Sequence, residues 1–453
     1  MSEFDVVVIG AGPAGEVCAG RLSQAGLSVA IVERDLVGGE CSFYACMPSK
    51  ALLRPAELLA EVARVPGASQ TVCRELDPAD VLARRDEVVH GLSDDAQIPW
   101  LESQGITLYR GRGRLDGDRR VTVGEETLTA RLAVVVATGT GAAVPPIPGL
   151  RELETWTNRE ATTVGSVPAS LLVIGGGVVG VELAQAWASL GSRVAVIEAL
   201  PRLLAREEPF AGEQVADALR GRGVEVRVEA RATGAERTPG GFRLTLEDGS
   251  ALEAEQVLVA VGRRPLTENL GLEPYGVEAG RSIGVDDQMR VSGHPWLYAI
   301  GDVNGRSLLT HMGKYQGRIA ADAILGREVR ATEDGPGAPR VVFTDPHVAA
   351  VGLTLAAALE RGIEARAVDH PMAAIAGASF YGRNAPGTAR IVVDEAERVL
   401  VGATFTGAGV AEFLHAATIA VVGRVPLDRL WHAVPSFPTR SEVWLRLLEK
   451  YGL

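Results

Sequence analysis

Two cysteines, Cys41 and Cys46, lie five positions apart in a segment that reads Gly-Gly-Glu-Cys-Ser-Phe-Tyr-Ala-Cys-Met-Pro-Ser-Lys and ends at Lys50. A thiol pair that opens and closes as a disulfide relays two electrons. Pro48 favours the first turn of a helix, so we expect a helix to begin near Cys46, where backbone dipoles stabilise a thiolate. A metal site is not favoured, because two further ligands are missing nearby. The segment therefore predicts a redox-active dithiol and no metal.

Cysteine and lysine are both scarce in this chain. It has four cysteines, which excludes a disulfide-stapled scaffold. We predict that the other two, Cys18 and Cys73, are buried and behave as small hydrophobes. Only three of the 45 Lys and Arg residues are lysines, namely Lys50, Lys314 and Lys450. Each lysine is therefore expected at a place where an arginine would not serve.

An internal repeat must position this dithiol. Residues 5–33 and 170–198 match without a gap at an offset of 165. Each copy has an apolar run, a G-x-G-x-x-G motif, a helix-like stretch and a second apolar run that ends in an acid. The motif glycines are Gly10, Gly12 and Gly15 in the first copy and Gly175, Gly177 and Gly180 in the second. The acids are Glu33 and Glu198, each 18 residues after the third glycine.

A G-x-G-x-x-G motif in this complete βαβ context indicates a dinucleotide site. The first glycine permits a tight turn, the second lets the backbone approach a pyrophosphate, and the third lets helix and strand pack closely. The helix N-terminus faces the phosphates, and the terminal acid accepts hydrogen bonds from ribose hydroxyls. Two such sites predict a reaction that moves electrons between two dinucleotide cofactors.

Two later apolar runs also end in glycine. One ends in Ala137-Thr138-Gly139, and the other, from Leu297, ends in Gly301-Asp302. Each can bring backbone close to a ligand at the carboxyl end of a strand. A buried Asp302 would suit a polyol chain such as ribityl, and a turn or helix cap is the alternative for this residue.

Length and composition narrow the class of protein. A chain of 453 residues suggests two to four domains, and 47% hydrophobic residues are ordinary for a globular protein. The net charge of −12 argues against nucleic-acid binding. No signal peptide precedes the first apolar run, and the longest apolar stretch, residues 171–191, fits a strand, a turn and a helix better than a membrane span. We therefore expect a soluble cytoplasmic protein with no membrane partner.

Together these motifs resemble the flavoprotein disulfide reductases, the class I pyridine nucleotide-disulfide oxidoreductases related to dihydrolipoamide dehydrogenase. The resemblance covers essentially the whole chain and extends to Gly262-Arg263-Arg264-Pro265, to Phe343-Thr344-Asp345-Pro346 and to Val351-Gly352. It implies an α/β fold with two Rossmann-like dinucleotide-binding domains and an α+β dimerisation domain. The implied domains are FAD-binding (1–150), NAD(P)-binding (151–270), central and completing the FAD site (271–336), and dimerisation (337–453). It also implies a homodimer whose active site is shared between subunits.

The resemblance implies roles for single residues. Cys46 corresponds to the flavin-proximal charge-transfer thiolate and Cys41 to the thiol that exchanges with substrate. Lys50 and Glu182 correspond to an ion pair beside the flavin and the nicotinamide, where a compact ammonium fits and a guanidinium would not. Asp302 corresponds to the ligand of the flavin ribityl chain. Further implied cofactor contacts are Gly113, Gly262 and the loop Leu308–His311 beside the isoalloxazine, which includes Leu309 and His311.

Glu198 bears on the choice of nicotinamide cofactor. A carboxylate at the end of this strand favours a free 2′-hydroxyl and repels a 2′-phosphate. Arg202 and Arg206 follow closely and could meet a phosphate, although solvated surface charge is the simpler interpretation. The sequence therefore favours NAD(H), with NADP(H) as the alternative.

The chain departs from the family near its C-terminus. Relatives carry His-Pro-Thr-x-Ser-Glu, whose His is the acid/base of the exchange thiol, whereas this chain has Phe437 and keeps Glu442. Phenyl cannot accept a proton, and general acid–base help is typically worth about 10²–10⁴-fold. His432 and Tyr381 are candidate substitutes, although packing or capping explains each more simply. One relative, 2-ketopropyl-coenzyme M oxidoreductase/carboxylase, also has Phe here, but with His at the position of Glu442.

The leading hypothesis is an FAD-dependent oxidoreductase that passes electrons from NAD(P)H, with NADH favoured, through FAD to the Cys41–Cys46 disulfide. The final acceptor is a disulfide or another small thiol-reactive electrophile. A direct flavin-to-quinone reductase, carbanion and carboxylase chemistry, and a flavin-binding scaffold are the alternatives. Mercuric ion and thioredoxin are not favoured, because none of the four cysteines lies beyond Cys73. The sequence leaves the identity of the acceptor open.

Overall fold

The computed structural model describes residues 2–72, 75–383 and 386–453. Cys73, predicted to be a buried hydrophobe, lies outside the described residues. The chain divides into two compact units: residues 1–48, 86–143 and 263–335 form unit 1, and residues 49–85, 144–262 and 336–453 form unit 2. Each unit is discontinuous in sequence. The four-domain division stays a prediction.

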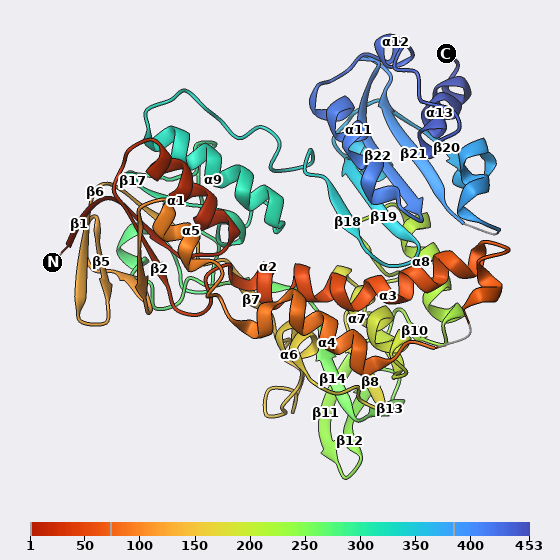
Figure 1. Ribbon diagram of the computed structural model, residues 1–453, viewed down its shortest axis with the longest axis horizontal. Coiled ribbons are helices and arrows are strands. Elements are labelled where there is room, and N and C mark those ends of the chain that lie inside the picture. Colours follow the sequence, from red (N-terminus) through yellow and green to blue (C-terminus); the bar gives the residue numbers. More distant parts are fainter. Residues whose placement is uncertain (1, 73–74, 384–385) are drawn as a thin grey trace. The chain divides into compact units, whose positions relative to one another are not determined.

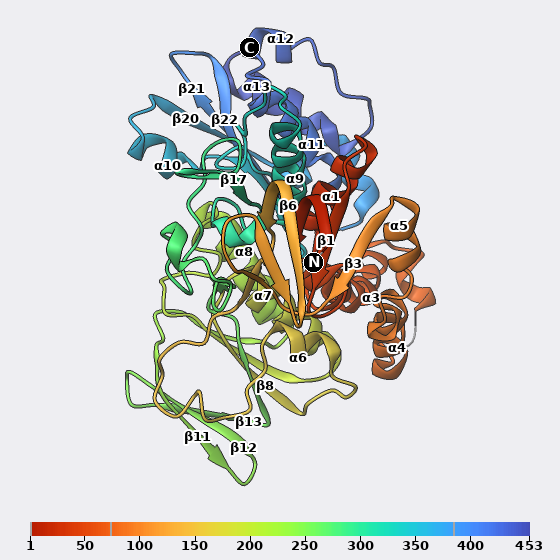
Figure 2. The same ribbon diagram turned by 90° about the vertical axis from the view of Figure 1, so that its left-hand side faces the viewer.

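Unit 1 is built on a sheet whose strands run in the order β16-β17-β6-β1-β2-β3 (Figure 2). β1, β2, β3, β6 and β17 pair in parallel, and β4 and β5 extend the sheet as an antiparallel hairpin beside β6. Its strands are β1 (Ser2–Ile9), β2 (Val29–Glu33), β3 (Ile106–Arg110), β4 (Gly113–Leu115), β5 (Arg120–Val123), β6 (Glu126–Val136), β16 (Arg290–Val291) and β17 (His294–Ala299). A separate two-stranded ribbon joins β7 (Thr140–Ala142) to β15 (Arg263–Pro265).

The helices of unit 1 follow directly from the first repeat copy. α1 (Pro13–Gln24) begins after the second motif glycine, with proline at its start. α9 (Thr310–Ile324) lies beside α1 in both views (Figures 1 and 2), because Gly317 has no side chain and a Cβ there would lie 2.7 Å from the Ala14 carbonyl oxygen. The shorter helices are α2 (Gly39–Phe43) and α5 (Ile98–Ser103). Fully buried β-branched residues of β1 and β2, such as Val8 and Ile31, form the core against these helices.

Unit 2 contains the second repeat copy. Its parallel sheet runs β10-β9-β8-β14, and the strand-turn-helix prediction for residues 171–191 is confirmed by β8 and α7. A three-stranded antiparallel sheet, β11-β12-β13, accompanies it. These elements are β8 (Ser170–Ile174), α7 (Val178–Ser189), β9 (Arg193–Ile197), α8 (Pro209–Gly221), β10 (Glu225–Arg227), β11 (Ala232–Thr238), β12 (Gly241–Leu246), β13 (Ala251–Ala254) and β14 (Gln256–Val259).

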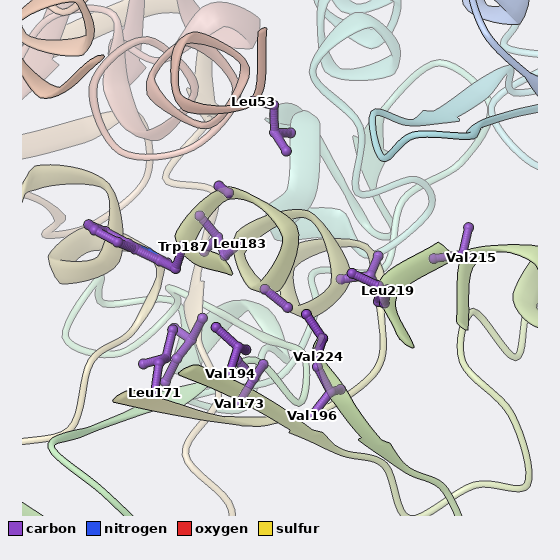
Figure 3. Packing of buried hydrophobic residues seen from close by; sticks show 14 of the residues in the cluster. Leu53, Leu171, Val173, Leu183, Trp187, Val194, Val196, Val215, Leu219 and Val224 are labelled. Atoms are coloured by element: carbon purple, nitrogen blue, oxygen red, sulfur yellow. The ribbon is translucent and has the colours of Figure 1, made fainter. Parts of the chain in front are cut away.

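The core of this part of unit 2 is the contact between α7 and the sheet. Figure 3 shows Trp187 and Leu183 of α7 above Leu171 of β8 and Val194 of β9, with Leu53 on the opposite side of the helix. All five side chains are buried. Leu53 belongs to α3 (Cys46–Arg64), which starts at the residue where a helix start was predicted. The neighbouring helices are α4 (Pro78–Val88) and α6 (Asn158–Thr163).

The C-terminal part of unit 2 is a five-stranded antiparallel sheet in the order β18-β19-β22-β21-β20. Helices α11 and α13 contribute Leu414 and Leu447 to its hydrophobic core. The elements are β18 (Arg340–Val342), β19 (His347–Gly352), α10 (Leu355–Glu360), β20 (Ala365–Pro371), β21 (Thr388–Asp394), β22 (Val399–Gly407), α11 (Val410–Val422), α12 (Leu427–Leu430) and α13 (Val443–Tyr451). Two α/β units and this α+β region confirm the predicted fold class. None of the helices in the described ranges combines the length and hydropathy needed to span a bilayer.

Candidate active site

The first motif forms a cradle at the start of α1. Gly10 has a φ of +109°, and a Cβ there would lie 2.4 Å from the Ala137 carbonyl oxygen. A Cβ on Gly15 would lie 2.0 Å from the Gly10 carbonyl oxygen, so helix and strand need a glycine at this contact. A Cβ on Gly12 would meet no atom within 4 Å, so the space beside the helix N-terminus is open. An open, glycine-lined helix N-terminus fits a pyrophosphate.

Glu33 lies where the motif predicts an acid that binds ribose. The Ala11 amide donates to its Oε2 at 2.8 Å, and the Asp35 amide donates to its Oε1 at 2.7 Å. The carboxylate is therefore held at the end of β2, next to the motif backbone. This placement fits the adenosine half of FAD.

The two cysteines predicted to be redox-active lie near the starts of two consecutive helices. Cys41 is in α2, and Cys46 is the first residue of α3. The Cys46 Sγ lies 3.3 Å from the Thr310 hydroxyl of α9. A hydrogen bond from Cys46, burial and the charge of Cys46 raise the pKa of Cys41, whereas Thr310 and Lys314 lower it. Because a charged Cys46 disfavours a second thiolate, Cys41 keeps its proton in the reduced pair.

The third described cysteine differs in environment. Cys18 is fully buried in α1, as predicted, and burial raises the pKa of its thiol to about 12. A thiol that stays protonated at neutral pH is a poor nucleophile. Cys18 is therefore a structural residue.

Asp302 is held by two residues that the sequence did not single out. It lies in a single 3-10 turn, Gly301–Asn304, and Thr140 donates a hydrogen bond of 2.8 Å to its Oδ2. Arg263 donates to the Thr140 hydroxyl at 2.7 Å and lies 3.8 Å from the carboxylate. Burial raises the pKa of Asp302, and Thr140 and Arg263 counter this. The carboxylate is a preorganised acceptor for a hydroxyl, as the ribityl hypothesis requires.

The second motif repeats this geometry in unit 2. Gly175 has a φ of +110°, a Cβ on Gly177 would meet no atom within 4 Å, and a Cβ on Gly180 would lie 1.9 Å from the Gly175 carbonyl oxygen. Glu198 accepts hydrogen bonds from the amides of Gly176 at 2.6 Å and Leu200 at 2.8 Å. The same cradle and the same acid therefore occur twice, and the second copy also fits a dinucleotide.

Lys50, which is partly exposed, forms an ion pair with the buried Glu182 within unit 2. The Lys50 Nζ lies 2.7 Å from Glu182 Oε2, and Glu182 is 3% exposed. The Phe343 amide donates to Glu182 Oε1 at 2.8 Å, and its ring lies 4.8 Å from the Lys50 Nζ. The ion pair implied by the resemblance is therefore present, and its place beside flavin and nicotinamide stays a prediction.

The C-terminal segment presents Phe437 to solvent, with 75% of its surface exposed. Glu442 is buried, and it accepts hydrogen bonds from the Ala376 amide at 3.1 Å and from Arg446 at 2.9 Å. Both oxygens of this carboxylate are therefore engaged without a histidine. His432 is exposed, and the Tyr381 ring lies 4.8 Å from the buried guanidinium of Arg440.

The remaining predicted cofactor contacts lie in different settings. Gly113 is buried in β4, where a Cβ would lie 3.0 Å from Ile9, and Gly262 is exposed after β14 with a φ of +140°. Thr138 donates to the Leu266 carbonyl at 2.8 Å. The predicted loop Leu308–His311 is corrected in part, because α9 begins at Thr310 and His311 is helical. Leu309 is the N-cap residue of that helix.

Comparison with known proteins identifies the family. The family model for pyridine nucleotide-disulphide oxidoreductases matches residues 4–317, and the model for their dimerisation domain matches residues 338–447. The chain belongs to the pyridine nucleotide-disulphide oxidoreductases. It is an NAD(P)H-dependent flavoprotein oxidoreductase that binds FAD, and the match to the dimerisation domain supports a homodimer.

Similar members of this family cover almost the whole chain. Dihydrolipoyl dehydrogenase of Thermus scotoductus is 35% identical over 451 residues, which span 98% of this chain and 96% of that protein. Mercuric reductase of Staphylococcus aureus is 30% identical and covers 97% of this chain, with 81% of its own length matched. The HOCl-induced flavoprotein disulfide reductase RclA from Escherichia coli has a TM-score of 0.87 at 26% identity, over 98% of this chain and 99% of that chain.

Sequence reasoning missed several residues of this oxidoreductase because their partners are distant in sequence. Thr310 contacts Cys46, Thr140 and Arg263 hold Asp302, and Phe343 contacts both members of the Lys50–Glu182 pair. Thr310 was inside the range assigned to the flavin-side loop, but nothing marked it individually. Phe343 and Arg263 lie inside motifs shared with the family, so the sequence marked their positions. It did not indicate which residues they contact.

The open space beside Gly12 and Gly177 allows the cofactor bound at each glycine motif to be tested separately. Gly12→Ala and Gly177→Ala should both fold, because a Cβ at either position meets open space and the φ angles of −76° and −78° suit alanine. We expect Gly12→Ala to weaken FAD binding and Gly177→Ala to raise the KM for the nicotinamide nucleotide while FAD stays bound. Flavin content and steady-state kinetics of the two variants check this. The opposite pattern would reverse the assignment of the two sites.

Proposed function

We propose that this oxidoreductase takes electrons from NADH, passes them through FAD to the Cys41–Cys46 disulfide, and delivers them to a small disulfide or a similar thiol-reactive acceptor. The observation that carries the proposal is the thiol pair itself. Cys46 lies at the start of α3 and contacts Thr310. A hydrogen bond with Cys46, burial and the charge of Cys46 raise the pKa of Cys41, which favours its protonated form. A thiolate and a thiol in one pair are the arrangement that disulfide exchange needs.

Disulfide exchange at Cys41 and Cys46 transfers one electron pair to the substrate disulfide. The cradle at Gly10, Gly12 and Gly15 would hold FAD, whose ring would supply the chemistry that accepts an electron pair from a reduced nicotinamide. Once the Cys41–Cys46 disulfide has been opened by that pair, Cys41 loses its proton and attacks one sulfur of the substrate disulfide, which releases half of the substrate as a thiol. Cys46 then attacks the Cys41 sulfur, re-forms the internal disulfide and releases the second half. The net reaction consumes NADH, one proton and one disulfide, and yields NAD⁺ and two thiols.

The second repeat copy supports NADH over NADPH. Glu198 presents a carboxylate at the end of β9, which repels a 2′-phosphate. Arg202, which could have bound that phosphate, instead donates hydrogen bonds to the carbonyl oxygens of Leu204, Glu207 and Ala205 at 3.2, 2.9 and 2.8 Å. The arginine is therefore already engaged by the backbone.

Nicotinamide preference is tested by comparing kcat/KM for NADH and NADPH. We expect NADH to be preferred by about 10-fold or more, and Glu198→Gln to narrow the ratio, because the repelling charge is removed while one acceptor oxygen remains. A wild-type preference for NADPH would contradict this part of the proposal.

The acceptor is tested with a panel used on enzyme reduced anaerobically by NADH. We expect rapid reoxidation by a small disulfide that depends on Cys41. Reoxidation by a quinone that is unaffected by Cys41→Ser would instead favour the direct flavin-to-quinone reductase. Cleavage of a β-ketothioether would favour carbanion chemistry.

We place the enzyme in the cytoplasm, because its reducing environment allows the thiol pair to alternate between the dithiol and the disulfide.

A further inference from the structure

Glu16 is an unusual residue in the first turn of α1. It directly follows the third glycine of the first motif, whereas the second copy has Val181 at the matching position. Its Oε1 is shut off from solvent and accepts no hydrogen bond from any described residue. A buried carboxyl oxygen without a partner is costly, so such a group usually has a function or a ligand. Burial raises the pKa of Glu16 to about 7.

Three helices bring Glu16 and the thiol pair into one region of unit 1. α2, which carries Cys41, starts against α1, because a Cβ on Gly39 would lie 2.9 Å from the Gly12 Cα. α9 packs on the first turn of α1 at Ala14 (Figure 1). The first residue of α9, Thr310, touches Cys46. The start of α1, the thiol pair and the start of α9 are therefore neighbours.

Lys314 links the two sites electrostatically. It lies one turn after Thr310 on the same face of α9. Its charge lowers the pKa of Cys41 and also the pKa of Glu16, so it acts on both groups. A lysine whose charge reaches both a thiol and a carboxyl group stabilises the negative charge on whichever of them has lost its proton.

We propose that Glu16 is the proton acceptor and donor for the exchange thiol Cys41, with Lys314 as the cation that couples them, in place of the histidine that Phe437 replaces. This inference rests on the proposed disulfide exchange at Cys41. The proton passes directly or through one water molecule, as is usual for general acid–base catalysis. Lys314 is a positioning residue, because it acts through the charges of its two neighbours.

Each proton of the proposed exchange reaction has a donor and an acceptor. The Glu16 carboxylate takes the proton of Cys41 as that sulfur attacks the substrate disulfide and the substrate S–S bond breaks. The resulting Glu16 carboxylic acid gives the proton to the departing substrate thiolate. When Cys46 attacks Cys41 and closes the internal disulfide, the second substrate thiolate takes a proton from solvent. Glu16 therefore ends in its starting state.

The pH dependence follows from the groups that face Glu16. These are Lys314 of α9, which favours the carboxylate, and Glu33 of β2, which disfavours it. Below about pH 7 Glu16 is protonated and cannot accept the Cys41 proton, and above that pH it can. Reoxidation of the reduced enzyme by a disulfide should therefore speed up as the pH rises through about 7.

The first test is Glu16→Gln, with Glu102→Gln as the matched control, because Glu102 is an exposed carboxylate of α5 in the same unit. Two rates are measured by anaerobic stopped flow on the holoenzyme: reduction by NADH, and reoxidation by a small disulfide between pH 5.5 and 8.5. In Glu16→Gln we expect an unchanged first rate, a second rate lowered about 10²-fold at pH 8, and loss of the rise near pH 7. Glu102→Gln should match the wild type in both.

Lys314→Met provides a second variant and a second readout. Without the lysine, the rise in the reoxidation rate should move to higher pH, and alkylation of Cys41 by iodoacetamide in the reduced protein should also shift to higher pH. Phe437→His should restore turnover to Glu16→Gln more than it raises that of the wild type. Wild-type pH profiles in both Glu16→Gln and Lys314→Met would overturn this inference alone. Failure of NADH to reduce the wild-type thiols would overturn the proposed function instead.

Discussion

Cys41→Ser should retain FAD reduction by NADH and lose turnover with small disulfides by about 10⁴-fold or more. The serine hydroxyl is not a nucleophile at neutral pH, and it cannot form a mixed disulfide with the substrate. Because Cys46 remains, the variant can still carry a thiolate, so the loss isolates the exchange step. Stopped-flow reduction by NADH and steady-state turnover with a small disulfide give the two rates.

Cys18→Ala is the matched control for this prediction. Cys18 is fully buried, and its thiol has a pKa of about 12, so it takes no part in exchange. We expect normal turnover, with a small loss of thermal stability from the deleted sulfur. Equal turnover of Cys41→Ser and wild type with a disulfide would show that electrons leave the flavin without the thiols.

Lys50→Met is expected to affect both stability and the nicotinamide half-reaction. The substitution leaves the Glu182 carboxylate, which is 3% exposed, without its cation at 2.7 Å. Because Lys50 itself is 35% exposed, solvent screening reduces the cost below that of a fully buried pair, and we expect a loss of about 2 kcal/mol in unfolding free energy. If the pair lies beside the flavin and nicotinamide, reduction of FAD by NADH should also slow about 10²-fold.

A double-mutant cycle separates these two effects. Lys50→Met with Glu182→Gln should recover most of the stability, because no uncompensated buried charge remains, but it should not recover the rate of FAD reduction. Lys450→Met is the control, since Lys450 is exposed and donates a hydrogen bond to the Asp369 carbonyl oxygen. A normal rate of FAD reduction in Lys50→Met would remove this lysine from the nicotinamide half-reaction.

Features of the fold that are formed by residues close together in the sequence could be predicted. The two βαβ copies, with Glu33 and Glu198 at the strand ends, follow from local spacing, and the helix start at Cys46 follows from Pro48. These features depend on turn geometry and helix capping, which nearby residues determine. The roles of these residues in binding and catalysis stay predictions.

Contacts between distant segments could not be predicted. Arg263 reaches Thr140, and Thr310 reaches Cys46, only after strands and helices have packed. The scarcity of lysine did mark Lys314, but its neighbours Glu16 and Cys41 emerge only when α1, α2 and α9 meet. The loop predicted at Leu308–His311 was two residues too long, because α9 begins at Thr310 and its first turn has no proline to mark the helix start in the sequence.

The most direct measurement is an anaerobic titration of the wild-type holoenzyme with one equivalent of NADH per FAD, followed by absorption spectroscopy. The proposed relay predicts that NADH produces a long-wavelength band from the Cys46 thiolate next to oxidised flavin in the wild type, and that Cys46→Ser shows no such band. In Cys41→Ser, which has no disulfide to reduce, the band should be present before NADH is added and should disappear as NADH reduces the flavin. A wild type that bleaches directly to reduced flavin without this band would contradict the relay, because the electrons would not have reached the thiol pair.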